Sequence, residues 1–397
     1  MKHRLIRGRT VKRAQPGRFV TTNVGGERVR AFLPRPLPPE PPLQMAGDLE
    51  QRLSRADIAL GRLDGVSGNL PDTHLFLYSY IRKEAVLSSQ IEGTQSSLSD
   101  LMLFELDEVP GVPLDDVVES SNYVAALEHG LARVRDGMPL SNRLLREMHA
   151  KLLSRGRGQD RSPGEFRRTQ NWIGGTRPGH AHFVPPPPQE LEQVMGDLEE
   201  FLHDDVHRTP TLLKAAMAHV QFETIHPFLD GNGRMGRLLI TMLLCLEGVL
   251  HQPVLYLSLY LKQHRARYYE LLDRVRSDGE WEEWVAFFAT AVEETANGAV
   301  ATAHRLGEMA RDDRVAVQRI GRVAGSALQV HQALLTRPVA TIASLSAQSQ
   351  LSIPAVTKSV KALVELGLVR ETTGRKRGRV FVYERYLELL QQGTEPL

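Results

Sequence analysis

Apolar residues recur at three- and four-residue spacing along most of the chain. The segments HLFLYSYIRKEAVLSSQIEG and LDDVVESSNYVAALEHGLARV show this spacing, and it returns from about Gln189 to about Leu306. A helix repeats every 3.6 residues, so the pattern predicts a mainly helical protein. Between residues 161 and 188 the chain reads RSPGEFRRTQNWIGGTRPGHAHFVPPPP. Its glycines and prolines predict a long loop with a short hairpin, with tips at Gly174-Gly175 and Arg177-Pro178-Gly179.

The two ends of the chain differ from this helical pattern. Residues 1–45 are basic and then proline-rich, which predicts mostly extended backbone. The basic start suits a targeting peptide, a nucleic-acid arm or a loosely docked tail. After about Arg314 the pattern predicts helix, short helix, turn, helix, two strands and a final helix, the order of a winged helix-turn-helix. We therefore expect an N-terminal segment 1–45, a helical region 46–125, a core 126–306 and a C-terminal domain 315–397.

Composition narrows the class of protein. The chain has 397 residues, of which 42% are hydrophobic and 24% charged, and its net charge of +2 does not by itself indicate a nucleic-acid partner. The single cysteine, Cys245, excludes an internal disulfide and a cysteine metal cluster, so a reducing, cytoplasmic location is expected. Apolar runs of about 20 residues are missing from the sequence, so no membrane span is predicted.

The segment IHPFLDGNGRMGR, from Ile225 to Arg237, interrupts two apolar runs. Its glycines allow successive backbone amides to converge on an anion, and the helix predicted from Met235 adds the positive end of its dipole. Two arginines supply permanent cations for phosphate oxygens. The loop therefore predicts a polyphosphate site.

Three side chains of this loop complete the predicted chemistry. Asp230 beside a phosphate site suggests a Mg²⁺ that bridges the carboxylate and the phosphates. Pro227 is expected to keep His226 extended and to lift its imidazole out of the preceding helix, where it would act as general base. Phe228 is expected to anchor the loop in the core.

The segment HPFLDGNGRMGR resembles the signature of the Fic family, H-P-F-x-(D/E)-G-N-G-R-x-x-R, at every defined position. The similarity extends to NWIGG…HFVPPPP and to VLYLSLYLKQHRARYYELLDRVRSDGEWEEWVAFF, and covers roughly residues 45–300. It implies a mainly α fold, with a Fic helical core, a short β-hairpin flap and a small α/β winged helix-turn-helix domain. It also implies transfer of AMP from ATP to a Ser, Thr or Tyr hydroxyl of a target protein and of the chain itself.

The resemblance assigns roles residue by residue. His226 would deprotonate the target hydroxyl, Asp230 would hold Mg²⁺, and Arg237 would hold the γ-phosphate. The predicted nucleotide-binding residues are Asp230, Gly231, Asn232, Gly233, Arg234, Met235, Gly236, Arg237 and, flanking the adenine, Tyr268 and Tyr269. The flap from about Ile173 to Pro186 would clamp the target by strand addition, through His182, Phe183, Val184 and Pro185.

The segment SSQIEG, Ser88–Gly93, resembles the family's inhibitory motif (S/T)-x-x-x-E-(G/N). Ser88 and Glu92 share one face of a helix that should end at Gly93. The resemblance implies that Glu92 pairs with Arg237 and blocks the γ-phosphate. In some relatives the same glutamate positions water to remove AMP, so a mainly deAMPylating enzyme is an alternative.

Further alternatives concern the partner and the class of protein. The recognition helix Ser352–Glu365 and the basic run Thr373–Arg379 suit DNA phosphates, but winged helices also bind proteins or regulate their own domain. A DNA-binding regulator with a nucleotide-sensing core and a homodimer therefore stay open. A metal-dependent hydrolase using His203, His207 and His219 is disfavoured because no nearby glutamate completes a zinc pattern.

Overall fold

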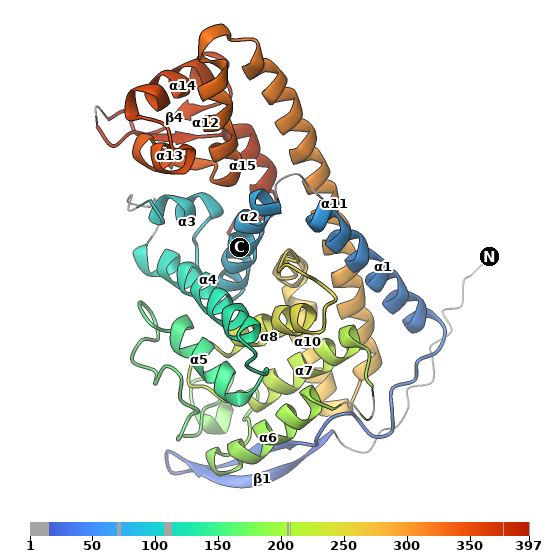
Figure 1. Cartoon of the computed structure of the whole chain (residues 1–397). Helices are drawn as coiled ribbons and strands as arrows, with labels where there is room; N and C mark the ends of the chain where they lie inside the picture. The colour runs from blue at the N-terminus through green and yellow to red at the C-terminus, as the bar shows by residue number, and fades with distance from the viewer. Residues whose placement is uncertain are drawn as a thin grey trace, which may run out of the picture.

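The structure is a computed structural model that describes residues 16–69, 73–106, 113–204, 206, 208–375 and 377–396. Helices dominate it, which confirms the predicted fold class (Figure 1). The helices are α1 Asp48–Asn69, α2 Thr73–Ile91, α3 Leu98–Phe104, α4 Leu114–Arg135, α5 Asn142–Leu152, α6 Leu191–Leu202, α7 Thr211–Ile225, α8 Asn232–Leu246, α9 Ser258–Gln263, α10 Arg265–Asp278, α11 Trp281–Gln318, α12 Ala324–Thr336, α13 Ile342–Ser349, α14 Ile353–Glu365 and α15 Glu384–Gln391. Across the described ranges, the apolar stretches of the helices are too short or too interrupted by charge to cross a bilayer.

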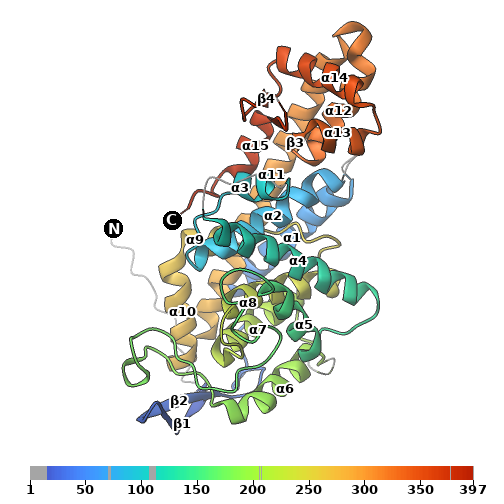
Figure 2. The ribbon, with the colours of Figure 1, turned by 90° about the vertical axis from the view of Figure 1, so that its left-hand side faces the viewer.

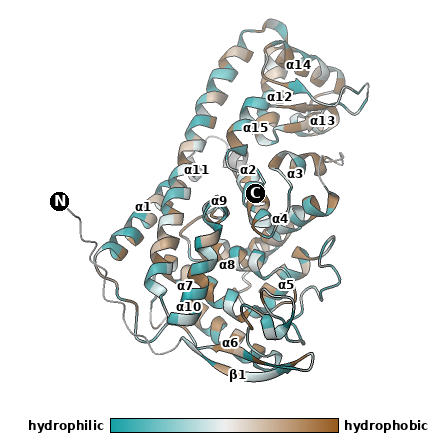
Figure 3. Cartoon of the chain, turned by 180° about the vertical axis from the view of Figure 1, so that it is seen from behind, coloured by the Kyte–Doolittle hydropathy of each residue, from teal (hydrophilic) through white to brown (hydrophobic). Residues whose placement is uncertain are grey.

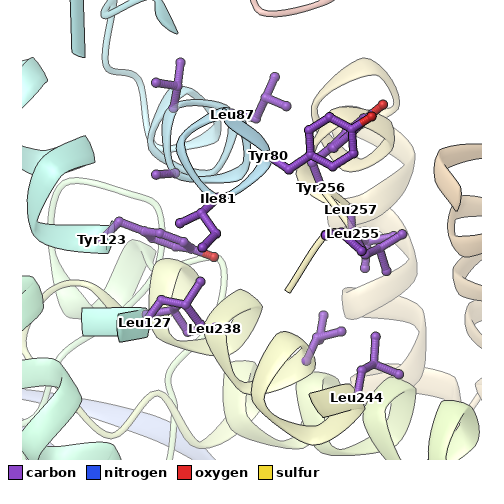
Figure 4. Packing of buried hydrophobic residues seen from close by; sticks show 14 of the residues in the cluster. Tyr80, Ile81, Leu87, Tyr123, Leu127, Leu238, Leu244, Leu255, Tyr256 and Leu257 are labelled. Atoms are coloured by element: carbon purple, nitrogen blue, oxygen red, sulfur yellow. The ribbon is translucent and has the colours of Figure 1, made fainter. Parts of the chain in front are cut away.

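The helix pair α7–α8 lies at the centre of the core. Every residue of α7 from Leu212 to Ile225 is buried, as expected for a helix that is covered on all sides. Figure 4 shows side chains of α2, α4 and α8 meeting around Ile81, Tyr123 and Leu238. Removing a buried leucine side chain of this kind costs about 2–5 kcal/mol, so this packing fixes α2 and α8 firmly beside each other.

The N-terminal segment forms a docked hairpin. Strands β1 Gly17–Val24 and β2 Glu27–Pro34 pair antiparallel, with Val24 opposite Glu27. Gly25 and Gly26 both have positive φ, as a two-residue hairpin turn requires. The extended backbone was predicted for this part, but its pairing and docking were not. Residues 1–15, where the targeting peptide or nucleic-acid arm was considered, lie outside the described residues.

Helix α11 connects the core to the C-terminal part of the chain (Figures 1 and 2). Its 38 residues span about 57 Å, and α1 packs along it. Figure 3 shows hydrophobic and hydrophilic residues alternating along this helix, as in an amphipathic helix with one covered face. The expected end of the core at residue 306 falls inside α11, which continues to Gln318. The predicted boundary between residues 125 and 126 falls inside α4.

The C-terminal part contains α12, β3 Val339–Thr341, α13, α14, β4 Arg370–Glu371, β5 Val380–Val382 and α15. The three strands form an antiparallel sheet in the order β3-β5-β4. This element order agrees with the predicted one and adds β3. Helix α14 begins at Ile353 after Ser352 as its N-cap, and the basic run Thr373–Arg379 joins β4 to β5, with Lys376 outside the described residues.

Candidate functional site

The connection between α7 and α8 begins with a left-handed residue. His226 has φ 50° and ψ 59°, and its amide donates to Phe222 O at 2.9 Å. The expectation that Pro227 keeps His226 extended was therefore wrong. A residue before proline is excluded from the right-handed helical region, and here it takes the left-handed one, which costs a non-glycine residue about 1–3 kcal/mol. Surrounding contacts must hold this conformation.

Arg167 provides such contacts and was missed by the sequence analysis. Its Nε donates to His226 O at 2.9 Å, its backbone amide donates to Pro227 O at 2.9 Å, and its Nη2 donates to Pro186 O at 2.5 Å. The side chain is buried, and burial lowers the pKa of Arg167 to about 10. The Arg167 guanidinium therefore links the backbone of His226, the candidate general base, to Pro186 at the end of the flap.

Helix α8 begins at Asn232, three residues before the predicted start at Met235. Gly231 is the N-cap with φ 76°, a conformation that favours glycine. The Asn232 side chain accepts from Phe228 N and donates to Phe228 O, both at 2.9 Å. Its polar atoms therefore close the loop, and only its backbone is left to face an anion.

His149 of α5 holds the same loop from the other side, and its role was also missed. Gly164 N donates to Nδ1 at 2.9 Å, so Nε2 carries the proton and donates to Asp230 O at 3.0 Å. The imidazole stacks on Phe228, with ring centroids 3.7 Å apart. Phe228 is fully buried, as predicted. Burial lowers the pKa of His149 to about 4 and keeps the ring neutral.

The loop and its neighbours enclose a pocket of about 200 Å³. Glu92, Glu119, Arg157, His226, Leu229, Asp230, Gly231, Asn232, Gly233 and Arg234 line it. Two residues that were predicted to contact the nucleotide, Met235 and Gly236, do not line this pocket. Met235 is fully buried, and Gly236 packs so closely on Glu223 that an added Cβ would lie 2.6 Å from Glu223 Oε1. Both residues pack in the core because they follow the first turn of α8.

Arg234 is buried beside the pocket. Its Nη1 donates to Glu119 Oε2 at 2.9 Å, and its Nη2 lies 3.9 Å from Asp230 Oδ1. The half-exposed Arg157 contacts the other Glu119 oxygen at 3.1 Å. Arg234 was predicted to lie at the phosphates, but its pairing with Glu119 and the contact of Glu119 with Arg157 were not predicted. Glu119 neutralises part of the positive charge that the two arginines bring to the pocket.

Arg237 forms the predicted ion pair with Glu92. Its Nη2 donates to Glu92 Oε1 at 2.6 Å, and its Nε donates to Ser88 Oγ at 2.7 Å. Burial raises the pKa of Glu92, but the Arg237 charge outweighs it and holds this pKa below its usual value. An added Cβ on Gly233 would lie 2.2 Å from Glu92 Oε1. Glycine at 233 therefore permits the carboxylate to reach Arg237.

Glu92 follows directly after α2, which ends at Ile91, and Gly93 takes φ 103°. The helix end therefore lies where the sequence predicted it. The Glu92 side chain is 34% exposed, whereas that of Arg237 is 2% exposed. The arginine is fixed in the core, and the glutamate is the partner that has room to move.

The imidazole of His226 also borders the pocket. Its Nδ1 is buried without a hydrogen-bond partner among the described residues. Burial and the charges of Arg276 and Arg167 lower the pKa of His226 to about 3. The ring is therefore neutral near pH 7 and holds a lone pair that accepts a proton.

The flap has less strand structure than predicted. Ile173 and Phe183 form a single antiparallel bridge, with Ile173 N donating to Phe183 O at 2.8 Å. Gly174 and Gly175 have positive φ, as expected for a tip. His182 is exposed and lies 2.6 Å from Asp273, while Val184 and Pro185 are buried against the core. Val184 O accepts from Phe32 N of β2, so this end of the flap already has a strand partner.

The two tyrosines predicted at the adenine separate in the structure. Tyr268 is 1% exposed and its hydroxyl lies 2.8 Å from His219 Nε2, so it is a core residue and is not available to a nucleotide. Tyr269 is 38% exposed. The reason is helical geometry, since adjacent residues on α10 point about 100° apart.

The disfavoured histidine metal site has no counterpart in the described ranges. His203 lies 2.9 Å from Leu140 O, and His219 is buried beside Tyr268. His207 lies outside the described residues. Within those residues, no three His, Cys, Asp or Glu side chains are grouped so that they could hold an ion.

A Mg²⁺ that arrives with a nucleotide fits the residues present. The Asp230 side chain is 39% exposed at the pocket, and its Oδ1 accepts from Gly231 N at 2.6 Å. Mg²⁺ characteristically takes one or two carboxylates together with phosphate oxygens and waters. One oriented carboxylate beside an anion nest therefore matches the donor set of a Mg²⁺–polyphosphate.

Comparisons with known proteins show which sequences this chain resembles. Residues 50–132 match the Fic/DOC family N-terminal model, and residues 139–244 match the Fic/DOC family model. The protein adenylyltransferase Fic of Aedes aegypti is 33% identical over 257 residues, covering 62% of this chain and 47% of that protein. The Culex quinquefasciatus protein of the same name is 34% identical over 211 residues, covering 52% and 39%. This chain thus spans less than half the length of these curated relatives.

Solved structures share the fold. A Fic family protein from Desulfovibrio desulfuricans G20 superposes with a TM-score of 0.58 at 20% identity, covering 87% of this chain and 98% of that chain. Residues 134–508 of Fic-1 from C. elegans give a TM-score of 0.51 at 21% identity, covering 65% and 73%. At this level of identity the similarity concerns the arrangement of the helices.

Proposed function

We propose that this chain, which belongs to the Fic/DOC family, transfers AMP from ATP to a hydroxyl group of a target protein. The observation that carries the proposal is the pocket before α8. A neutral histidine, an oriented carboxylate and the amides of a helix N-terminus face one space, and Arg237 lies one turn further along α8. The curated relatives named protein adenylyltransferase support the same chemistry.

The proposed reaction is an in-line displacement at the α-phosphorus. His226 takes the proton of the target hydroxyl while that oxygen bonds to the α-phosphorus, and the bond to the bridging oxygen breaks to release pyrophosphate. The amides of Gly231, Asn232 and Gly233 bind the phosphates at the positive end of α8. Asp230 would hold a Mg²⁺, which would supply positive charge to the phosphates. Arg234 is held by Glu119, so we assign its charge to the electrostatics of the pocket.

Glu92 acts in this proposal as an inhibitor of the site. Its carboxylate occupies the Arg237 guanidinium, which we assign to the γ-phosphate. The two anions compete for one cation, so a nucleotide meets an incomplete phosphate site while the pair persists. Ser88 supports the inhibited arrangement because it accepts from the same guanidinium.

The target segment is proposed to add as a strand to the flap near Ile173 and His182. His182 is one of several flap side chains that face solvent, whereas Val184 and Pro185 are buried beneath the flap. The C-terminal part is proposed to be a winged helix-turn-helix on the basis of its element order. Basic side chains at Lys358, Lys361, Arg377 and Arg379 suit DNA phosphates, and a protein partner or a second copy of the chain is the alternative.

The test uses Glu92→Gly protein incubated with Mg²⁺ and ATP labelled either at the α-phosphate or in the γ-phosphate. AMP transfer predicts that protein acquires the α-label only, with a mass increase of one AMP group per modified hydroxyl. Protein that gains the γ-label would identify phosphorylation instead. Protein that gains neither label, in the presence of a cell lysate as target source, would contradict the proposal.

A second activity is favoured by the position of Glu92. Its carboxylate borders the same pocket as His226 and Asp230, where it can orient water towards a protein-bound AMP. We propose removal of AMP as the activity of the Glu92-containing form. Protein labelled by the Glu92→Gly variant should lose AMP when parent protein is added, and should keep it when Glu92→Gln protein is added.

A further inference from the structure

The residues after α15 run back from the C-terminal part to the catalytic core (Figures 1 and 2). Three side chains of the core donate hydrogen bonds to three backbone carbonyl oxygens of this segment. Lys83 Nζ donates to Gln392 O at 2.9 Å, Gln90 Nε2 donates to Thr394 O at 2.8 Å, and Lys262 Nζ donates to Glu395 O. Helices α2 and α9 thus form a site for the turn that follows α15, in which Thr394 N donates to Gln391 O at 2.8 Å.

The donors of this site are buried. Lys83, Gln90 and Lys262 each have no more than 5% of their surface exposed. Burial lowers the pKa of Lys83 to about 8 and lowers that of Lys262 as well. Placing two amines in the interior is costly unless acceptors are present, and the carbonyls of residues 392–395 are acceptors that meet this need.

The segment is also matched to the site in shape. Thr394 is buried, and Gly393 lies against Leu259 with φ 80°. An added Cβ on Gly393 would lie 2.6 Å from Leu259 Cδ1. A side chain at 393 would therefore meet both backbone strain and a clash. The site accepts a glycine at this position and excludes larger residues.

The site touches the helix end that carries Glu92. Gln90 lies between Ser88 and Glu92, and its carbonyl accepts from Gly93 N at 3.0 Å. The Gln90 side chain is held on three sides, because Nε2 donates to Ser96 O and Thr394 O, and Oε1 accepts from Lys262 at 2.7 Å. Removing the segment would leave a buried amide and a buried amine without these acceptors at the turn that positions Glu92.

We propose that Lys83, Gln90 and Lys262 form a peptide-binding site whose internal ligand is residues 392–395, and that occupancy of this site holds Glu92 on Arg237. The inference rests on the proposed function for its effect on AMP transfer. Because the segment directly follows α15, which packs on α2, α3 and α11, a ligand that displaces the C-terminal part also withdraws the internal ligand. Release of residues 392–395 then loosens the end of α2 and frees Arg237 for the γ-phosphate.

The test compares full-length Gly393→Val with full-length Gly378→Val. Both positions have positive φ, but Gly378 has no atom within 4 Å of an added Cβ, so it matches the backbone strain without the clash. The first readout is hydrogen exchange of amides 86–96. Exchange there should be faster in Gly393→Val than in Gly378→Val, and a synthetic peptide spanning Gln391–Glu395 should slow it again. Equal exchange in the two variants would overturn the inference, whatever the enzyme's activity.

The second readout is AMP transfer. Gly393→Val should raise it roughly 5- to 150-fold over Gly378→Val, the range expected for coupling between two sites. In the Glu92→Gly background the same substitution should add less than twofold. An equal increase in both backgrounds would overturn the link to Glu92. If Glu92→Gly protein transfers no AMP while exchange responds as expected, the peptide site stands and the proposed function fails.

Discussion

Single residues with several polar contacts hold the candidate site in place. Three hydrogen bonds of 2.9–3.0 Å join His149 and Arg167 to the backbone of the signature loop, and two more join them to Gly164 and Pro186. Neither residue belongs to the signature itself. Their side chains act on carbonyl oxygens, and those contacts fix where His226 and Asp230 point. Substitutions at these positions therefore test geometry without removing a reacting group.

Two substitutions of His149 can each keep one of its two hydrogen bonds and remove the other. The amide nitrogen of Gln can replace Nε2 as the donor to Asp230 O, and the amide oxygen of Asn can replace Nδ1 as the acceptor from Gly164 N. In the Glu92→Gly background, His149→Asn should raise the Mg²⁺ concentration for half-maximal transfer by roughly fivefold, for a lost hydrogen bond of about 1 kcal/mol. His149→Gln should change it less. Equal Mg²⁺ requirements in the two variants would show that the Asp230 contact does not orient the carboxylate.

His226 should be required for transfer but not for nucleotide binding. His226→Ala should lower AMP transfer by about 10²–10⁴-fold, because the target hydroxyl loses its general base, while ATP affinity stays within about twofold. The pKa of His226 is lowered to about 3 by burial and by Arg276 and Arg167, so the free enzyme holds it neutral above that pH. The pH profile of kcat/KM should therefore lack an inflection near 6.5. An inflection at that pH which His226→Ala removes would contradict the buried, neutral imidazole.

At the scale of the elements, the sequence predicted the kind of structure better than the exact position of each residue in it. The helical pattern, the end of α2 before Gly93 and the buried Phe228 are all present in the structure. The start of α8 was placed too late, because Asn232 and Gly233 are poor interior helix formers but are favourable in the first turn once Gly231 caps it. Tyr268 was misplaced because adjacent tyrosines on one helix cannot share an environment. His149 and Arg167 were missed because their contacts join segments distant in sequence, which periodicity cannot report.

The contact between α2 and α8 carries the inhibition in this proposal. Glu92→Gly should raise AMP transfer roughly 5- to 150-fold, corresponding to a coupling of about 1–3 kcal/mol. Arg237→Ala should lower transfer, and adding Glu92→Gly to it should restore little, because both residues act on one ion pair. The measurement is the four-member cycle at fixed ATP and Mg²⁺. Equal activation by Glu92→Gly with and without Arg237 would place the effect of the glutamate elsewhere.

At the scale of the whole molecule, the core includes two buried carboxyl groups close to the site. Glu84 of α2 accepts from Ser258 N at 3.0 Å, and Glu223 of α7 has its Oε1 buried without a partner among the described residues. Burial raises the pKa of each to about 7. The free energy of unfolding therefore depends on the protonation state of both carboxyl groups.

The raised pKa of Glu223 determines whether the free energy of unfolding rises or falls with pH. Between pH 4.5 and about 7 the folded protein keeps a proton on Glu223 that the unfolded chain has released, so the free energy of unfolding falls as pH rises through this window. The loss approaches about 3 kcal/mol above pH 7, from 1.36 kcal/mol per pKa unit. Glu223→Gln removes the ionisation and should therefore raise the free energy of unfolding by about 3 kcal/mol at pH 8 but by less than about 1 kcal/mol at pH 5. Denaturant unfolding at both pH values provides the measurement, with the exposed Glu294→Gln as a control that should change neither value. A Glu223→Gln gain that is the same at pH 5 and pH 8 would mean that the carboxyl keeps its ordinary pKa in the folded core.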